Sequence, residues 1–182
     1  MLIPIVIAAV ALPGALAAYA ATRPNTFRHE RSTTIQAPPE AILPHITDFR
    51  RWEAWSPFEK LDPEMKKAFS GAASGPGAVY TWEGRKAGAG RMEIRETSPR
   101  RVVIQLDFSK PFKASNTAEF TLEPEGAATR VTWTMYGPTP FVSKLMGVLI
   151  DLDRMIGKDF AAGLASLKTI AERQPAGAPA TR

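Results

Sequence analysis

The stretch 139–173, TPFVSKLMGVLIDLDRMIGKDFAAGLASLKTIAER, decides the fold of this chain. Thr139 is a residue type that caps helix N-termini, and Pro140 suits the first helical position because its missing N–H is not needed there. A helix over 140–173 has about 34 residues and a length of roughly 50 Å. Its apolar side chains recur every three or four positions and therefore form one stripe. They are Phe141, Leu145, Leu149, Leu152, Ile156, Phe160, Leu164, Leu167 and Ala171.

A helix of this length is stable only if something large covers its apolar stripe, and the middle of the chain supplies strands. From residue 66 onward the hydrophobic period is two, and Gly, Pro or Ser separates most of the segments. Val102, Ile104 and Leu106, for example, alternate with polar residues. This pattern predicts an antiparallel sheet with one buried face and one wet face. The expected strands are 65–70, 77–82, 88–96, 101–108, 115–122 and 130–136.

The part of the domain before these strands adds one strand and two short helices. Residues 26–36 alternate as a strand, 39–47 form a short helix, and 48–55 form a second short helix or turn. An antiparallel sheet with its helices on one face belongs to the α+β class. The sequence therefore predicts a curved antiparallel sheet of seven strands that wraps around the long C-terminal helix.

The two ends of the chain lie outside this domain of residues 26–173. Residues 1–21 contain no charged side chain and are just long enough for a single transmembrane anchor. A cleaved signal peptide is the alternative, but no Lys or Arg precedes the apolar run. Arg23, Arg28 and Arg31 follow it, which favours a cytoplasmic domain by the positive-inside rule. Residues 22–25 are a linker, and the Pro, Gly and Ala of 174–182 predict a disordered tail.

The composition excludes several function classes. The net charge is +5, but Lys and Arg are scattered among Glu and Asp, so we expect no nucleic-acid partner. The chain has no Cys and only two His, His29 and His45. This scarcity argues against a thiolate or histidine metal centre and against a histidine-based triad. We expect no metal and no cofactor.

Several segments together resemble the START-related helix-grip superfamily, also called SRPBCC. They are TTIQAPPE at 33–40, DFRRWEAWSP at 48–57, the GPG turn at 75–77, and KDF with GL at 158–160 and 163–164. Bacterial members of the polyketide cyclase/dehydrase type are the most similar. The resemblance covers residues 26–173. It implies a cavity between sheet and helix that holds a lipid or another hydrophobic ligand, and only some members of the superfamily are enzymes.

The predicted buried face is rich in large, adaptable side chains that suit such a cavity. Trp52 and Trp55 lie three residues apart on one helical face, where they either pack in the core or form a lid over the cavity mouth. The other side chains of the set either fill a core or line the cavity. They are Tyr80, Trp82, Met92, Leu106, Phe108, Phe120, Trp133 and Met135 on the strands, and Leu149, Ile156 and Phe160 on the helix.

Two residues of the helix interrupt its apolar stripe. Gly163 lies between Phe160 and Leu167, where it leaves space for a ligand or permits close contact with a strand. Asp159 projects near the stripe in phase with Phe141 and Leu152, and a carboxylate there needs a partner. That partner is a structural ion pair or hydrogen bond, or the head group of a ligand. A catalytic acid or base is the third interpretation.

Three hypotheses for function follow. The leading one is a membrane-tethered protein that binds a hydrophobic small molecule or lipid without chemistry of its own. The second is a cyclase or dehydratase that uses a pocket carboxylate as general base. The third is an interaction module like the co-chaperone members of the superfamily, which would have a filled core and an exposed apolar patch. The sequence leaves the ligand and the oligomeric state open.

Overall fold

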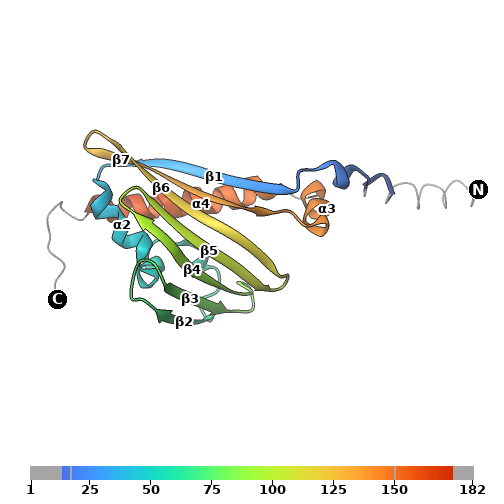
Figure 1. Ribbon diagram of the computed structural model, residues 1–182, viewed down its shortest axis with the longest axis horizontal. Coiled ribbons are helices and arrows are strands. Elements are labelled where there is room, and N and C mark those ends of the chain that lie inside the picture. Colours follow the sequence, from blue (N-terminus) through green and yellow to red (C-terminus); the bar gives the residue numbers. More distant parts are fainter. Residues whose placement is uncertain (1–13, 17, 150, 174–182) are drawn as a thin grey trace, which may run out of the picture.

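The computed structural model describes residues 14–16, 18–149 and 151–173, without the side chains of residues 146 and 149. Seven strands and five helical elements follow one another after a helical stretch at 14–16 and 18–22 (Figure 1). In chain order they are β1 (Thr26–Ile35), α2 (Pro39–Thr47), η1 (Phe49–Ala54), η2 (Pro57–Lys60), β2 (Lys66–Gly71), β3 (Ala78–Glu83), β4 (Ala89–Ser98), β5 (Arg101–Lys110), β6 (Ala114–Glu125), β7 (Ala128–Pro138), α3 (Phe141–Leu149) and α4 (Leu152–Arg173).

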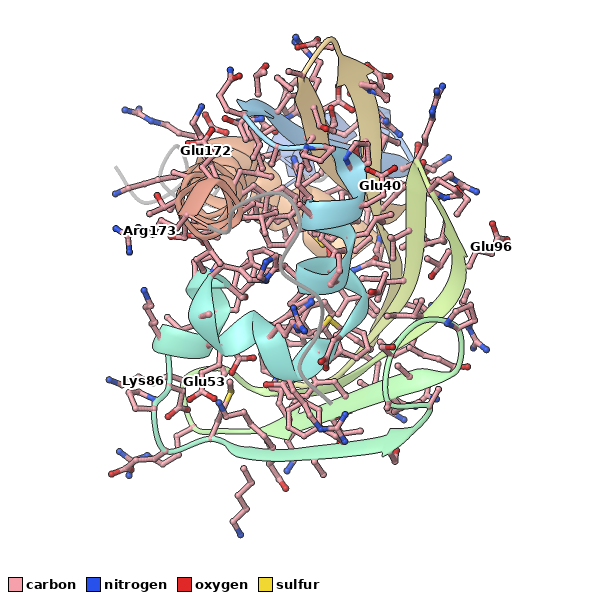
Figure 2. All side chains as sticks on the ribbon, turned by 90° about the vertical axis from the view of Figure 1, so that its left-hand side faces the viewer. Glu40, Glu53, Lys86, Glu96, Glu172 and Arg173 are labelled. Atoms are coloured by element: carbon pink, nitrogen blue, oxygen red, sulfur yellow. The ribbon has the colours of Figure 1, made fainter. Side chains whose placement is uncertain are left out.

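The strands form one antiparallel sheet in the order β1-β7-β6-β5-β4-β3-β2. Strands β2 to β7 form a meander of successive hairpins, and β1 pairs with the last strand, from Thr26 opposite Pro138 to Ile35 opposite Thr129. Figure 2 looks along α4 and shows the sheet curving around α4 and the short helices. The predicted α+β class and the seven-stranded curved sheet are confirmed.

The hydrophobic alternation fixes which face of each strand is covered. On β5, Val102 and Ile104 are fully buried, and on β6 Phe120 and Leu122 are as well. The opposite face carries charged pairs, such as Arg101 Nε donating to Glu119 Oε1 at 3.0 Å. A strand with apolar residues on every second position is stable only when that one face is covered. Here the helices provide the cover.

The predicted single helix over 140–173 is wrong, because the chain forms two helices there. α3 ends at Leu149 and α4 begins at Leu152. Asp151 Oδ1 accepts the N–H of Arg154 at 2.9 Å, so Asp151 caps a new helix. Asp is among the strongest N-cap residues because its carboxylate satisfies an N–H that has no partner inside the helix. The predicted cap at Thr139 does not form: the helix begins at Phe141, and Thr139 Oγ1 has no hydrogen-bond partner among the described residues.

α4 is held against the sheet by an apolar stripe and by polar contacts to β1. Phe160, Leu164 and Leu167 of the stripe are at most 2% exposed. Near the start of α4, Asp153 Oδ2 accepts from Arg31 Nη2 at 3.1 Å. Near its end, Lys168 Nζ donates to the carbonyl oxygen of Thr34 at 2.6 Å. The direction and register of α4 are therefore fixed at both ends.

The short helices after β1 cover the part of the sheet that α4 does not. α2 coincides with the predicted 39–47 and buries Ile42 and Ile46 completely. The predicted second helix is η1, a 3₁₀ helix that Asp48 Oδ1 caps by accepting from Arg50 N at 3.0 Å. η2 follows directly and was not predicted. These elements form one side of the site described below.

No helix in the described parts of the chain is long and apolar enough to cross a membrane. The predicted anchor at 1–21 falls largely on residues outside the described ranges, and so does the predicted tail at 174–182. The helical residues 14–16 and 18–22 lead away from the sheet at the end of the molecule where α3 lies (Figure 1).

Candidate ligand cavity

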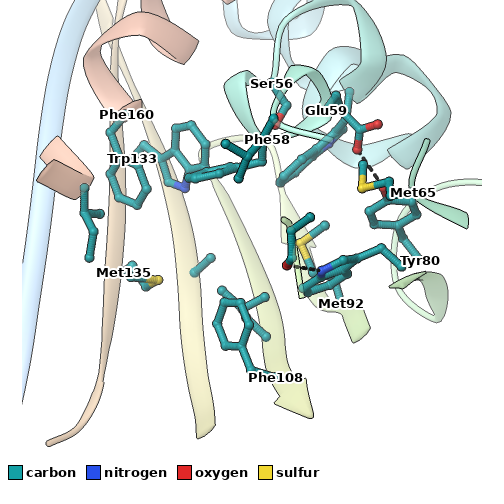
Figure 3. A pocket seen from close by; sticks show the side chains of 17 residues that line it. Ser56, Phe58, Glu59, Met65, Tyr80, Met92, Phe108, Trp133, Met135 and Phe160 are labelled. Carbon is teal, nitrogen blue, oxygen red and sulfur yellow. Dashed lines mark hydrogen bonds between the residues drawn. The ribbon is translucent and has the colours of Figure 1, made fainter. Parts of the chain in front are cut away.

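A cavity of about 300 Å³ lies between the sheet, the first half of α4 and the segment around η2 (Figure 3). Strands β3 to β7 supply one wall, α4 supplies Ile156 and Phe160, and η2 with its flanks supplies the rest. Most of the lining is aromatic, aliphatic or thioether. Its residues are Trp52, Ser56, Phe58, Glu59, Leu61, Met65, Tyr80, Trp82, Ala87, Met92, Leu106, Phe108, Ala118, Trp133, Met135, Ile156 and Phe160.

An aromatic cluster forms the end of the cavity nearest α4. The ring of Trp133 stacks on Phe160 with centroids 4.2 Å apart and planes only 4° from parallel. The ring of Trp52 meets Trp133 edge-on at 6.2 Å. Trp52 cannot swing easily, because its Nε1 donates to the carbonyl oxygen of Ile46 at 3.0 Å. Stacked and edge-to-face pairs of this kind give the cavity a preformed wall.

The opposite end of the cavity depends on a glycine. A side chain at Gly90 would lie 2.5 Å from the indole of Trp82, so only glycine allows Trp82 to lie across the strand there. Trp82 Nε1 donates to the carbonyl oxygen of Ala87 at 3.1 Å, and its ring meets Phe108 edge-on at 5.7 Å. Ala118 lines the same wall and leaves space because its side chain is a single methyl group.

One carboxylate lies in this otherwise apolar lining. The side chain of Glu59 is 6% exposed, and its Oε1 accepts from the hydroxyl of Tyr80 at 2.7 Å. Lys67 Nζ donates to Glu59 Oε2 at 2.8 Å. Burial raises the pKa of the Tyr80 phenol, and the hydrogen bond to Glu59 raises it further. Tyr80 therefore keeps its proton at neutral pH and acts as a donor.

Two further polar groups of the lining have no partner within the described residues. They are Ser56 Oγ and Trp133 Nε1, on residues that are 1% and 3% exposed. Figure 3 shows the nitrogen of Trp133 on the side of the ring that faces the interior of the cavity. Buried donors are nearly always paired in native proteins, so these two atoms mark where an additional polar group would fit.

Comparison with known proteins assigns the fold to a family. Residues 26–172 match the family described as "Polyketide cyclase / dehydrase and lipid transport". This chain belongs to that family. The superfamily expected from the sequence segments is thereby confirmed. Among curated proteins, none matches the sequence.

Solved structures with the same fold share little sequence with this family member. Protein CV1439 from Chromobacterium violaceum is 18% identical over 84% of this chain and 100% of its own, with a TM-score of 0.58. The Aha1 dimer from Colwellia psychrerythraea is 19% identical over 81% of this chain and 97% of its own, also at 0.58. DynU16, a putative protein in the dynemicin biosynthetic locus, is 16% identical over 80% of this chain and 47% of its own, at 0.56. At these identities the likeness shows the fold alone.

Most of the residues predicted for the site do lie around the cavity. They are Trp52, Tyr80, Trp82, Met92, Leu106, Phe108, Trp133, Met135, Ile156 and Phe160. Trp55 and Phe120 are instead packed in the core behind Trp133, at ring distances of 5.5 Å and 5.0 Å. Neither Trp52 nor Trp55 is a lid, because both are at most 3% exposed. Leu149, also predicted for the site, has a side chain outside the part of the chain that the structure describes.

The two residues that interrupt the helix stripe also lie outside the lining. A side chain at Gly163 would meet Trp133 Cζ3 at 2.8 Å and Pro57 Cδ at 2.9 Å, so this glycine permits close packing. Asp159 is half-buried at the edge of the stripe, in phase with the half-buried Leu152. The prediction had also placed it in phase with Phe141, but that phase is lost where the helix breaks at Asp151.

The sequence patterns missed the lining residues that come from irregular segments. Ser56, Phe58, Glu59 and Leu61 lie in or beside η2, where no period of two or 3.6 assigns a face, and Met65, the first residue of the predicted strand 65–70, lies just before β2. Phe58 and Leu61 are 39% and 52% exposed, which makes them the rim of the cavity. The signal available was Phe58 and Leu61 three residues apart, directly after the two tryptophans of η1.

Proposed function

We propose that this chain binds a hydrophobic small molecule or the apolar part of a lipid in the cavity. The observation that carries the proposal is the cavity itself: about 300 Å³, apolar, and preformed by a rigid aromatic cluster. Ligand sites in proteins start at about this volume and have this kind of lining. At roughly 30 Å³ for each water-sized group, the occupant has about ten non-hydrogen atoms inside the cavity.

Binding without chemistry accounts for the site better than a cyclase or dehydratase does. A general base needs a carboxylate that is free to take a proton from the substrate. Glu59 is the carboxylate of the lining, and it already accepts hydrogen bonds from Tyr80 and Lys67. Asp159, the other proposed base, lies outside the lining. An interaction module with a filled core is also less favoured, because the core of this chain is hollow.

We also propose that residues 1–21 tether the domain to a membrane, with the domain on the cytoplasmic side. Two features support a tether: the absence of charge in that segment, and the exposure of Phe141 and Val142, at 49% and 58%, at the end of the molecule where the segment leaves (Figure 1). Arg23, Arg28 and Arg31 support the cytoplasmic side. Fractionation of cells should find the full chain with the membranes and a chain lacking 1–21 in the soluble fraction. A full chain in the soluble fraction would refute the tether.

The binding proposal is tested with a variant that fills the cavity. In Ala118→Phe a ring replaces the methyl group in the cavity wall, whereas Thr121→Phe adds a ring to the outer face of the same strand. The full chain and both variants are purified gently, and co-purified small molecules are extracted and measured by mass spectrometry. We expect a molecule that is present in the full chain and in Thr121→Phe but depleted at least about ten-fold in Ala118→Phe. Equal amounts of co-purified molecules in the unchanged protein and both variants, with no uptake from a lipid extract, would refute binding in the cavity.

A further inference from the structure

The tryptophans of this chain differ in what their N–H groups reach. Trp52 donates to the carbonyl oxygen of Ile46, and Trp55 to that of His45 at 2.9 Å. Trp82 donates to Ala87. Trp133 is as deeply buried as Trp52, yet within the described residues no acceptor lies in reach of its Nε1. The fold therefore provides an acceptor for each indole except the one whose nitrogen faces the cavity.

An indole N–H can donate a hydrogen bond but cannot accept one. A buried donor without an acceptor loses its hydration and gains nothing in return, which destabilises the empty protein. A ligand that brings an oxygen to this position would recover that loss, whereas a pure hydrocarbon would not. Trp133 is held in place by its stack on Phe160, so the donor is already oriented before binding.

The charge on the cavity wall restricts which oxygen can enter. Glu59 is the ionisable group of the lining besides Tyr80, and the phenol of Tyr80 keeps its proton and donates a hydrogen bond to that carboxylate. Lys67, whose positive charge balances the negative charge of Glu59, binds the other carboxylate oxygen of Glu59 and does not line the cavity. A second carboxylate inside this small apolar space would be desolvated and repelled by Glu59. A neutral oxygen meets neither penalty.

We propose that the ligand is an uncharged, mainly apolar molecule with a carbonyl-type oxygen, which accepts a hydrogen bond from Trp133 Nε1, and that Glu59 excludes carboxylic acids. This inference rests on the proposed function, since it assigns a ligand class to the same cavity. Ser56 Oγ, the second unpartnered polar atom of the lining, can donate to the same molecule or to a water that accompanies it.

The test uses three probes of similar size: 2-decanone, its isostere 2-methyl-1-decene, in which a CH₂ group replaces the oxygen, and decanoate. Equilibrium dialysis measures the binding of each to the full chain, and the value for Ala118→Phe in the same preparation is subtracted. This subtraction removes the partitioning of probes into detergent or into the apolar N-terminal segment. Trp133→Phe keeps a ring to stack on Phe160 but removes the donor.

We expect Trp133→Phe to weaken 2-decanone binding about five-fold more than it weakens alkene binding, which is the usual size for one neutral hydrogen bond. Glu59→Gln should raise the affinity for decanoate at least about ten-fold relative to the affinity for 2-decanone. Equal losses for ketone and alkene in Trp133→Phe would overturn the role of the indole. If the unchanged protein bound decanoate as tightly as 2-decanone, the proposal that Glu59 excludes carboxylic acids would be overturned.

A second measurement needs no variant at Trp133 or Glu59. In a ¹H–¹⁵N spectrum of the full chain, 2-decanone should move one indole N–H resonance downfield, and the alkene should not. No selective shift would overturn the inference. If ketone and alkene both bind, but without this difference, the proposed function stands and the ligand class is wrong. If neither binds better to the full chain than to Ala118→Phe, the proposed function fails and the inference fails with it.

Discussion

The interior of this protein has two halves that differ in how completely they are filled. In the filled half, side chains from β1, β4, β5, β6, β7 and the second half of α4 belong to one core cluster and are at most 1% exposed. In the hollow half, strands β3 to β7, the segment around η2 and the first half of α4 surround a cavity of about 300 Å³. The filled half consists of Ile35, Ile94, Val102, Ile104, Leu122, Val131, Leu164 and Leu167.

The difference between the halves is one of side-chain shape more than of hydrophobicity. The filled half is made of branched aliphatic residues, which interdigitate closely. The hollow half is made of aromatic rings and thioethers, which stack on one another and leave irregular space between them. Trp133 stacked on Phe160 marks the boundary. A sheet and helix of uniform hydrophobicity can thus contain a defined cavity if the side-chain types change along the strands.

The attachment of α4 to the sheet also differs between the halves. Over the filled half it is held by Leu164, Leu167 and Ala171, which are buried. Over the hollow half, Asp153 accepts from Arg31 at 3.1 Å and bonds His29 Nδ1 at 2.9 Å. Both ends of α4 therefore have polar contacts to β1, but the contact at its start includes an ion pair, and its end also has the buried apolar residues of the filled half.

The largest expected effect is the difference in stability between core truncations in the two halves. Leu122→Ala in the filled half should lower the free energy of unfolding by about 3 kcal/mol, because it creates a cavity that the packed surroundings cannot close. Met135→Ala, its matched partner in the hollow half, should cost only about 1 kcal/mol because its side chain already borders empty space. Urea unfolding of the full chain measures both. Equal losses would mean that the two halves are packed alike.

The second prediction compares the same substitution in the two C-terminal helices. Gly163→Ala places a methyl group 2.8 Å from Trp133 and should destabilise the protein by about 1–3 kcal/mol, despite the better helix propensity of Ala. At Gly147 in α3 the nearest atom to the new methyl group is Leu152 Cδ1 at 4.0 Å, so Gly147→Ala should stabilise by up to about 1 kcal/mol. Thermal unfolding shows whether each variant is more or less stable than the unchanged protein. A stabilising Gly163→Ala would contradict the close packing at the boundary between the halves.

The smallest expected effect concerns the charged attachment of α4. The hydrogen bond from Arg31 holds the pKa of the Asp153 carboxyl below its ordinary value, and His29 contributes in the same direction. These contacts stabilise the folded state at pH values above the ordinary pKa of an Asp carboxyl. The stabilisation is lost as the pH falls through the lower pKa that Asp153 has in the folded protein. Because Asp153 is 56% exposed, the effect is below about 1 kcal/mol.

Asp153→Asn should therefore lower the urea midpoint slightly at pH 7, and the gap to the unchanged protein should narrow as the pH falls from about 5 toward 3. In an Arg31→Met background the same substitution should have less effect at pH 7. A gap that widens in acid would show that Asp153 is not held in its charged form by these contacts.

The fold could be predicted from the sequence because its strands repeat one simple pattern. Alternation assigns a face to every residue of β5, β6 and β7, so Leu106 and Trp133 were placed inside correctly. The break between α3 and α4 was missed because Asp151 fits the polar side of a continuous helix as well as it fits a cap. The local signal was the residue type itself, because Asp is preferred at helix N-caps.

The site could be predicted only in part. Alternation shows which side chains of a strand point inward, but it does not show where along the strand the cavity lies. Phe120 and Trp133 both point inward, but Phe120 is in the core behind Trp133 and lies outside the lining. The unpredicted Glu59 and Ser56 come from the segment around η2, where tertiary contacts alone decide what faces the cavity. The polar groups that limit the choice of ligand were thus the least accessible to sequence analysis.

The pairing of β1 with β7 has a consequence for how the protein is made. Ile35 leaves the ribosome about 100 residues before its partner Thr129, and α4 follows later still. At about 5–20 residues per second, the inner face of β1 waits several seconds or more for the strand beside it and for the helix that covers it. Closing so long a loop also slows folding itself. We therefore expect β1 to be the strand most dependent on chaperones or on early contact with another surface during synthesis.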